Sequence, residues 1–310
     1  MEFHKRDKII IDTDPGTDDA LAIMMALNSK ALSIECITTV GGNATLADTT
    51  RNTLRIIEHL GIPISHDLNK PGIPIVKGSS RPIKGTFRYG YSYHGKSALG
   101  VRLHPAKSTT YPANATEFIA RIASEYPNQV TLVALGPLTN IAKAIISHPQ
   151  FRKQVKQLVV MGGAIKIPGN VTKYAEFNIY NDPVAAELVF SSGIPTKLIP
   201  LDICTDVNFA KENSPWVKSK SATAILSNRI LNNWFESHPD HLKYNLYDPM
   251  ALVATIKPNL LKYKQAKITV LKGGTQSGRT VARHGNGSVK IAIGTDKCKS
   301  EEFISKLLAL

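Results

Sequence analysis

Short runs of apolar, β-branched residues recur along the chain and alternate with longer segments whose apolar residues return at helical spacing. Runs of the first kind predict strands, and segments of the second kind predict amphipathic helices. The predicted strands are residues 8–12, 34–40, 130–135, 157–161 and 197–203, and the predicted helices are residues 18–29, 47–60, 114–124, 138–147 and 182–190. Because strands that alternate with helices form parallel sheets, we expect an α/β fold with a Rossmann-like, open, mostly parallel sheet flanked by helices.

The pattern runs through the chain without an internal repeat or a linker rich in Ser, Gly or Pro, which predicts one domain over residues 1–310. Two segments depart from it, near residues 70–111 and 208–247, and long excursions of this kind often carry binding loops or lids. Near the C-terminus, residues 267–272 and 289–293 are predicted strands, and the glycine-rich segment 273–287 between them is interpreted as the loop of a hairpin.

Composition is that of a globular protein, with 43% hydrophobic and 20% charged residues in a chain long enough to bury a full core. Apolar runs fall short of the roughly 20 residues that span a bilayer, and the first residues do not resemble a signal peptide, so we expect a cytoplasmic protein with no membrane partner. Three widely spaced cysteines, Cys36, Cys204 and Cys298, indicate reduced thiols rather than disulfides or a zinc site.

The formal net charge of +14 raises the possibility of nucleic-acid binding, because contacts to phosphates are made by Lys and Arg. These residues are scattered along the chain, however, and no dense basic run is interleaved with aromatic residues. We therefore expect a solvated basic surface and no nucleic-acid partner.

Four aspartates follow the first predicted strand within eight residues: Asp12, Asp14, Asp18 and Asp19. Carboxylates this close raise one another's pKa unless a positive charge compensates them. A helix that starts near Thr17, with Thr17 as its cap, would stabilise Asp18 or Asp19 but not the other two. Oxygen ligands without a nearby Cys or His suit Ca²⁺ or Mg²⁺, and the carboxyl end of a parallel strand is where α/β sheets bind ligands. The cluster therefore predicts a metal or catalytic site.

Other predicted strands also end in glycine turns or polar residues. Gly41-Gly42-Asn43, Gly136-Pro137 and Gly162-Gly163 each follow a strand, and Asp202 lies near the end of another. Singly, each Gly-Gly is typical of a tight turn and Asp202 of an ordinary loop. Together they indicate that several strand ends converge on one rim.

The segment Asp12-Thr13-Asp14-Pro15-Gly16-Thr17-Asp18-Asp19-Ala20 resembles the D-x-D-P-G-x-D-D-A signature of the inosine-uridine-preferring nucleoside hydrolases. The resemblance continues in order along nearly the whole chain. The further matching blocks are Gly41-Gly42-Asn43, His94-Gly95-Lys96-Ser97, Leu135-Gly136-Pro137-Leu138-Thr139-Asn140, Met161-Gly162-Gly163, Ala175-Glu176-Phe177-Asn178 and Asp248-Pro249.

The resemblance implies hydrolysis of the N-glycosidic bond of ribonucleosides, giving ribose and free base. It also implies a Ca²⁺ cofactor held by Asp14, Asp19, Asp248 and the backbone carbonyl of Leu135, with Asp18 as the general base that activates a metal-bound water. Calcium acidifies water less than zinc does, which makes such a base chemically necessary. Direct attack by water on an oxocarbenium-like centre predicts inversion at the anomeric carbon.

The family's ribose contacts carry over to Asn43, Met161, Asn170, Glu176 and Asn178, together with Asp18. Amide and carboxylate groups suit a polyhydroxylated sugar, although Asn170 could equally be a turn residue and Met161 a core residue. Asp12 is expected behind the ligands, orienting the loop or its waters. The family also implies a homo-oligomer, either a dimer or a tetramer.

The chain departs from the family at the side of the leaving base. Tyr247 stands where many pyrimidine-cleaving members have a His, and a phenol is a poorer proton donor than an imidazole at neutral pH. His94 matches the family's other histidine near the base, and Lys96 stands where a Glu is common. His238 or His241 could approach the base, although surface exposure explains both equally simply, and Trp234 with Phe235 could form an aromatic wall or simply helix core.

Two alternatives have a basis in the residues. A strand that ends in Asp-x-Asp also opens haloacid dehalogenase-like phosphatases, which use Mg²⁺ and an aspartyl-phosphate intermediate. The second Asp pair and Glu176-Phe177-Asn178 have no place in that scheme. The basic charge alone would favour a non-catalytic module that binds nucleosides or nucleic acid without turnover.

Overall fold

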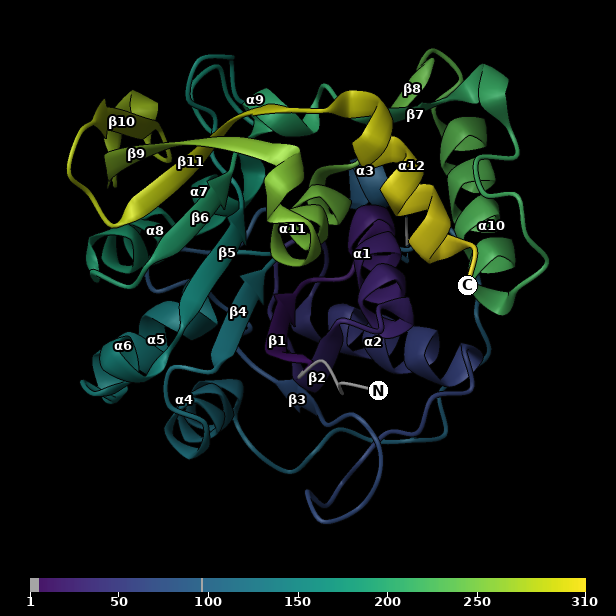
Figure 1. Ribbon diagram of the computed structural model, residues 1–310, viewed down its shortest axis with the longest axis horizontal. Helices are drawn as coiled ribbons and strands as arrows, with labels where there is room; N and C mark the ends of the chain where they lie inside the picture. The colour runs from purple at the N-terminus through teal and green to yellow at the C-terminus, as the bar shows by residue number, and fades with distance from the viewer. Residues whose placement is uncertain (1–5, 96) are drawn as a thin grey trace.

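A nine-stranded sheet forms the centre of the protein in the computed structural model, which describes residues 6–95 and 97–310. Its strands follow the order β10-β9-β11-β6-β5-β4-β1-β2-β3 (Figure 1). They are β1 Asp7–Thr13, β2 Leu32–Thr39, β3 Ile75–Lys77, β4 Val130–Ala134, β5 Gln157–Met161, β6 Thr196–Ile199, β9 Leu261–Val270, β10 Thr280–His284 and β11 Val289–Thr295. The neighbours from β3 to β11 pair in parallel, and β9 pairs antiparallel with both β10 and β11. The predicted α/β class and mostly parallel sheet are confirmed.

Helices cover both faces of this sheet. They are α1 Thr17–Asn28, α2 Leu46–His59, α3 Tyr91–His94, α4 Ala115–Glu125, α5 Thr139–Ser147, α6 Phe151–Gln154, α7 Phe177–Asn181, α8 Pro183–Ser191, α9 Leu201–Cys204, α10 Ala222–Ser237, α11 Tyr247–Ile256 and α12 Lys297–Leu308. Three short 3-10 helices lie at Lys211–Asn213, Pro258–Leu260 and Gly274–Gln276. The strands β7 Asn208–Ala210 and β8 Lys243–Asn245 form a separate antiparallel pair.

Side chains of β1 show how the two hydrophobic cores divide. Ile9 and Ile11 pack with residues of α1, α2, α10, α11 and α12, whereas Ile10 packs on the opposite face with residues of α4, α5 and α8. All three isoleucines are fully buried. Because successive residues of a strand point to opposite faces, a strand buried on both sides appears in the sequence as the continuous apolar run that predicted it.

The strand order reverses between β1 and β4. From β1 the chain runs outward through β2 and β3, and it then returns to place β4, β5 and β6 on the other side of β1. The crevice beyond the carboxyl ends of two strands at such a reversal is the general ligand site of open α/β sheets. Asp12 lies at the end of β1, and Leu135 directly follows β4, so the aspartate cluster is placed at this crevice.

Two predictions for the second half of the chain were wrong in detail. The strand expected at residues 197–203 ends at Ile199, because Pro200 caps the short helix α9, and Asp202 lies on that helix and does not line the cavity described below. There its carboxylate accepts hydrogen bonds from the backbone N–H groups of Ile165 and Lys166. The glycine-rich segment 273–287 is more than a hairpin loop, because it contains β10, which pairs with β9.

The two excursions contain regular structure. Residues 70–111 include β3 and α3, and residues 208–247 include β7, β8 and the sixteen-residue helix α10. The described part of the chain holds no helix that is both long and apolar enough to cross a membrane. Cys36, Cys204 and Cys298 are free thiols, as expected.

Candidate active site

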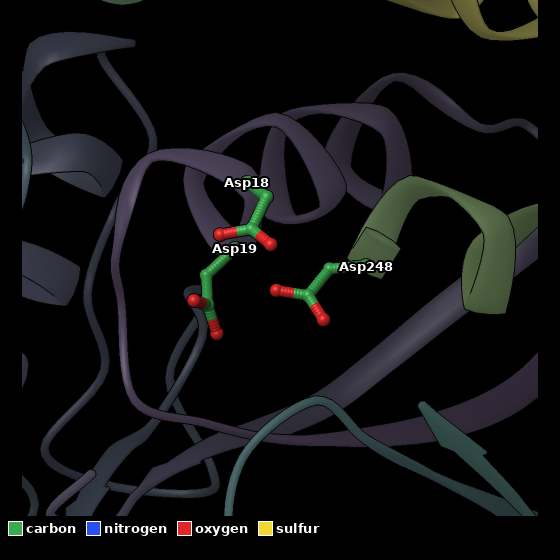
Figure 2. A group of neighbouring side chains, drawn as sticks. All are labelled: Asp18, Asp19 and Asp248. Atoms are coloured by element: carbon green, nitrogen blue, oxygen red, sulfur yellow. The ribbon is translucent and has the colours of Figure 1, made fainter. Parts of the chain in front are cut away.

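Three carboxylates meet at the crevice between β1 and β4. Asp18 and Asp19 belong to the first turn of α1, and Asp248 belongs to the first turn of α11, more than two hundred residues later in the chain. Figure 2 shows the three side chains turned toward one another. One oxygen from each lies within 4.8 Å of the other two, and all three residues are buried. The fold therefore unites two of the predicted metal ligands with the predicted base.

Asp14 enters the same site from the loop after β1. Its Oδ2 accepts a hydrogen bond of 2.6 Å from the backbone N–H of Asn43, and its buried Oδ1 has no hydrogen-bond partner within the described chain. A Cβ atom added at Gly42 would lie 2.1 Å from Asp14 Oδ2, and one added at Gly136 would lie 2.5 Å from Oδ1. The glycines after β2 and β4 thus leave room for this carboxylate as well as forming turns.

Asp19 and Asp12 are held by hydrogen bonds from different parts of the fold. Asp19 accepts from the Thr13 hydroxyl at 2.5 Å, from the Gly16 N–H at 2.9 Å and from the Asn43 amide at 3.0 Å. Gly16, not Thr17, is the N-cap of α1, so the expected Thr17 cap was wrong. Asp12 accepts from Thr38 and Asn140 through Oδ1.

Burial raises the pKa of every carboxyl in this cluster. With Asp19 beside it, burial raises the pKa of Asp18 from 3.8 to about 8, and burial partly offset by Thr38 raises the pKa of Asp12 to about 6. The pKa of Asp14 and that of Asp248 lie well above the ordinary value, mainly because both groups are buried and secondly because the charge of Asp19 is near. No Lys or Arg is paired with these groups in the described chain.

A hard divalent cation fits this donor set. Three buried carboxylate oxygens have no hydrogen-bond partner among the described residues, namely Asp12 Oδ2, Asp14 Oδ1 and Asp18 Oδ1, and such oxygens are costly unless a positive charge compensates them. Oxygen-only donors at the carboxyl end of a strand match the preference of Ca²⁺ or Mg²⁺. The Leu135 carbonyl already accepts from the Asn178 amide at 2.6 Å, and a carbonyl oxygen retains a second lone pair.

A cavity of about 280 Å³ opens above the carboxylates. Most of the predicted substrate and catalytic residues line it, namely Asp18, Asn43, His94, Leu135, Met161, Asn170, Glu176, Asn178, Tyr247 and Asp248. These residues come from eight separate parts of the chain, and the tertiary fold brings them together. The cavity is therefore a pocket with a carboxylate floor and walls that combine polar and aromatic side chains.

Backbone N–H groups anchor the polar wall opposite Asp18. The Glu176 carboxylate caps α7, accepting from Asn178 and Ile179, and it also accepts from Gly163. Three such bonds make burial of its charge tolerable. The exposed Asn170 accepts from the Phe177 N–H at 2.9 Å, which ties the loop before α7 to the cavity rim.

His94 lies against the start of α1. Its Nδ1 accepts from the Thr17 backbone N–H at 3.2 Å and lies 3.0 Å from the Thr17 hydroxyl. His94 is 6% exposed. Its pKa is lowered from 6.5 to about 3, mainly by burial and secondly by the charge of His238. The imidazole is therefore neutral at physiological pH.

Tyr247 lines the cavity directly before Asp248, and its hydroxyl accepts from the Asn245 amide at 3.0 Å. Burial raises the pKa of Tyr247 to about 12. The phenol therefore keeps its proton at neutral pH, and it can donate a hydrogen bond without giving that proton away.

Trp234 and His241, predicted to contact the base, are not among the described residues that line the cavity. Trp234 is 2% exposed and belongs to the core formed by α10, where Phe235 also lies. It packs behind the cavity-lining Tyr93, with ring centroids 5.4 Å apart, and the His238 ring stacks on Trp234 at 4.4 Å while also lying 5.7 Å from Tyr93. His241 is exposed. Lys96, the other departure on this side, lies outside the described residues.

Sequence reasoning missed several residues of the cavity wall. Arg88, Tyr89, Ser92 and Tyr93 come from the segment that precedes His94, Val171 directly follows Asn170 in its loop, and Phe177 is the first residue of α7. The aromatic run Tyr89-Gly90-Tyr91-Ser92-Tyr93 next to a family histidine was the available signal. Its composition alone could not distinguish a cavity wall from core, because aromatic residues serve both purposes.

The raised carboxyl pKa values predict how stability depends on pH when divalent cations are removed. In the unfolded chain the carboxyl groups of Asp12 and Asp18 both lose their protons above about pH 3.8. In the folded protein Asp12 keeps its proton up to about pH 6, and Asp18 keeps its proton up to about pH 8. The free energy of unfolding must therefore fall as pH rises through this window, by about 1.4 kcal/mol per pH unit for each retained proton. Urea unfolding in chelator between pH 5 and 8 measures the slope.

Asp18→Asn provides the matched comparison, because it removes one of these titrations and keeps the size of the side chain. Its slope between pH 6 and 8 should be shallower than that of the unaltered protein. Equal slopes would contradict the assignment of a raised pKa to Asp18.

The fold and the cavity define an α/β protein with a carboxylate-floored pocket at the topological switch point of its sheet. Over residues 9–304 the chain matches the inosine-uridine preferring nucleoside hydrolases, and it belongs to that family. It is 37% identical over 294 residues to uridine nucleosidase 1 of Arabidopsis thaliana, covering 92% of this chain and 85% of the relative. It is 34% identical to the pyrimidine-specific ribonucleoside hydrolase RihA of Citrobacter koseri, covering 88% of this chain and 87% of the relative.

Solved structures agree with this membership. A plant nucleoside hydrolase superposes with a TM-score of 0.90 at 30% identity, covering 98% of this chain and 99% of the other. A purine-preferring ribonucleoside hydrolase from Gardnerella vaginalis superposes with a TM-score of 0.88 at 28% identity, covering 97% and 98%. The predicted family is confirmed, and the protein is an enzyme that acts on the N-glycosyl bond of ribonucleosides. Neither the phosphatase nor the non-catalytic alternative finds support in these relatives.

Proposed function

We propose that this enzyme hydrolyses ribonucleosides by direct attack of water on the anomeric carbon, with Asp18 as general base and Ca²⁺ as cofactor. The observation that carries the proposal is the meeting of Asp18, Asp19 and Asp248 at the floor of the cavity. Asp18 is the member of this group best suited to act on water, because it lines the cavity and its buried Oδ1 accepts no hydrogen bond within the described chain.

The bond changes follow from this arrangement. Water forms a bond to C1′ and loses a proton to Asp18, while the C1′–N bond breaks and its electron pair leaves with the base. Positive charge that develops on the ribose ring faces the buried carboxylates, which stabilise it electrostatically. Because water attacks directly, the sugar product is inverted at C1′.

Asp14, Asp19, Asp248 and the Leu135 carbonyl would hold the cation. When bound, Ca²⁺ would supply the positive charge that this floor lacks, lowering the pKa of Asp18 and polarising the oxygens of water and ribose. Without a cation, Asp18 is protonated at neutral pH and cannot accept a proton. Asp12, hydrogen-bonded to Thr38 and Asn140, keeps the end of β1 in register behind the ligands.

Ribose recognition is assigned to Asn43, Met161, Asn170, Glu176 and Asn178. All five line the cavity. Two of them also bind the proposed cation ligands, since the Asn43 amide donates to Asp19 and the Asn178 amide donates to the Leu135 carbonyl. Amide and carboxylate groups of this kind distinguish ribose from deoxyribose, because a sugar that lacks a hydroxyl leaves its buried protein partner without a hydrogen bond. We therefore expect 2′-deoxynucleosides to be poor substrates.

Pyrimidine ribonucleosides, uridine first, are the substrates we propose. Relatives named as uridine nucleosidases and pyrimidine-specific hydrolases are 34–37% identical to this chain. Tyr247 and Tyr93 form the aromatic side of the cavity, and a neutral His94 and a protonated Tyr247 both offer hydrogen-bond donors to a carbonyl-rich base.

A reducing-sugar assay across uridine, cytidine, inosine, adenosine, guanosine and their 5′-phosphates tests the proposal. We expect ribose release with uridine as the preferred substrate and little release from the 5′-phosphates. Phosphate release from a nucleotide without ribose release would favour the phosphatase alternative, and binding without any turnover would favour the non-catalytic one.

Tyr247→Phe tests whether the phenol only donates a hydrogen bond. We expect kcat/KM for uridine to fall by about threefold to tenfold, the equivalent of one hydrogen bond, with an unchanged pH profile between pH 6 and 9. Because the pKa of Tyr247 lies near 12, the phenol stays protonated throughout this range, and we expect its removal to leave the pH profile unchanged. Loss of the alkaline limb of the profile, or a loss of activity beyond a hundredfold, would show instead that Tyr247 transfers a proton.

A homodimer or homotetramer and a cytoplasmic location remain predictions that follow from the family and from the sequence. Light scattering coupled to size-exclusion chromatography would measure the mass of the assembly.

A further inference from the structure

A chain of hydrogen bonds joins the cavity-lining His94 to a buried tyrosine that does not itself line the cavity. The Tyr244 hydroxyl donates to the Thr17 hydroxyl at 2.8 Å, and the Thr17 hydroxyl lies 3.0 Å from His94 Nδ1. Tyr244 belongs to β8 in the second excursion and is fully buried, and His94 belongs to the first excursion. This chain links the two excursions through the first residue of α1.

The direction of each bond can be read from its donors. The Thr17 backbone N–H can only donate, so the Nδ1 atom that receives it carries no proton. Because Tyr244 donates to the Thr17 oxygen, the proton of the Thr17 hydroxyl is free to point at the same Nδ1. In a neutral imidazole the remaining proton must then be on Nε2.

We propose that Tyr244 and Thr17 are positioning residues that hold His94 as the Nε2–H tautomer, so that His94 offers a neutral N–H donor to the departing base. The acceptor would be a carbonyl or ring nitrogen beside the glycosidic nitrogen, such as O2 of a pyrimidine. The inference rests on the proposed hydrolysis and adds a role for two residues outside the cavity wall.

Three features of the surroundings support this arrangement. The Thr17 N–H is one of the helix-terminal donors that α1 itself cannot satisfy, so it is available to the ring. A Cβ atom at Gly16 would lie 2.7 Å from both Nδ1 and Cε1 of His94, so the glycine lets this edge of the ring rest on the helix start. The Tyr93 ring packs edge-on against the imidazole at 4.9 Å. The ring is thus held on several sides while it lines the cavity.

The consequence for the reaction concerns the leaving group. As the C1′–N bond breaks, its electron pair moves onto the base, and a fixed N–H donor stabilises the charge that develops there. No proton needs to leave His94 in this step. A substrate whose leaving group is already stable as an anion should gain little from the donor.

The experiment combines spectroscopy with kinetics on the full chain. Nitrogen-15 NMR of the histidine rings at neutral pH, with His94 assigned by comparison with His94→Gln, should show the Nε2–H tautomer. In Tyr244→Phe and Thr17→Val, which keep the Thr17 backbone N–H but disturb the hydroxyl contact, the His94 Nδ1 signal should move toward that of a nitrogen with fewer hydrogen bonds. Thr17→Ser, which keeps the hydroxyl, should restore the spectrum.

Kinetics then separate positioning from general damage. Tyr244→Phe should lower kcat for uridine by about threefold to tenfold with KM changed less than twofold, the equivalent of one hydrogen bond. It should leave the hydrolysis of 4-nitrophenyl β-D-ribofuranoside within twofold, because nitrophenolate needs no donor. Tyr263→Phe is the matched control, since it removes a buried hydroxyl on β9 that has no hydrogen-bond partner within the described chain. It should change neither the spectrum nor kcat.

An Nδ1–H or doubly protonated His94 in the unaltered protein would overturn the proposal, as would an equal loss of activity on both substrates in Tyr244→Phe. These results are distinguishable from a failure of the proposed hydrolysis, which would appear as absence of ribose release by the unaltered enzyme.

Discussion

Asp18→Asn should lower kcat for uridine hydrolysis by about 10²- to 10⁴-fold, the usual contribution of a general base. The amide has the shape of the carboxylate, but it cannot accept a proton from water. Because Asp18 carries no hydrogen bond from another side chain in the described chain, the substitution removes no structural side-chain partner. We therefore expect folding to persist, and without a cation the variant should be more stable than the unaltered protein above pH 6, because its folding no longer requires a proton to be taken up by a buried carboxyl group.

The measurement is steady-state ribose release together with thermal unfolding of each variant. Glu302→Gln is the matched control, because it makes the same chemical change at an exposed position on α12 and should leave both quantities unaltered. KM for Asp18→Asn should change far less than kcat, since the defect lies in the reaction step. Ribose release within tenfold of the unaltered rate would exclude Asp18 as the base.

Removal of divalent cations is expected to have an equally large effect. Treatment with a chelator should abolish ribose release, and addition of Ca²⁺ in excess of the chelator should restore it. The physical reason is the cluster of carboxyl groups, whose pKa values rise because the groups are buried and lie beside one another's negative charges. A neutral, protonated Asp18 cannot activate water, and ribose would lose the cation that binds its hydroxyls.

The same experiment has a readout that does not depend on activity. A cation that binds only the folded protein stabilises it by about 2.7 kcal/mol at a free concentration one hundred times its Kd. Ca²⁺ should therefore raise the unfolding temperature of the chelated protein, and Asp14→Asn should weaken this response. Substituting Mg²⁺ tests the preference of the site, because Mg²⁺ tolerates irregular coordination poorly. Full activity after complete chelation would contradict the cofactor assignment.

Much of the fold followed from local pattern. The strands β1, β2, β4 and β5 lie within two residues of their predicted ends, because each is buried on both faces and so appears as a continuous apolar run. Strand β10 was missed for the opposite reason. It lies at the edge of the sheet, and its residues are largely half-buried or exposed, so no apolar run marks it.

The aspartate motif directed attention to the end of β1, where the fold brings Asp18 and Asp19 together with Asp248, since the motif combines residue type, spacing and position in one short segment. Asp248 could be added only through the family resemblance, because α11 joins the site across a tertiary contact that no local pattern records. The leaving-group side was the least predictable. Trp234 belongs to an aromatic cluster beside the cavity, and which ring of that cluster reaches the cavity depends on the packing of α10 against Tyr93.

The sequence by itself thus determined the parallel sheet, the acidic site at the end of its first strand and the family to which the chain belongs. All three depend on residues close together in the chain or on an ordered series of motifs. Only the tertiary structure decided which carboxylates face one another, which aromatic rings form the cavity wall and how Tyr244 reaches His94 through Thr17. These contacts join segments more than seventy residues apart, and their geometry is set by packing rather than by local preference.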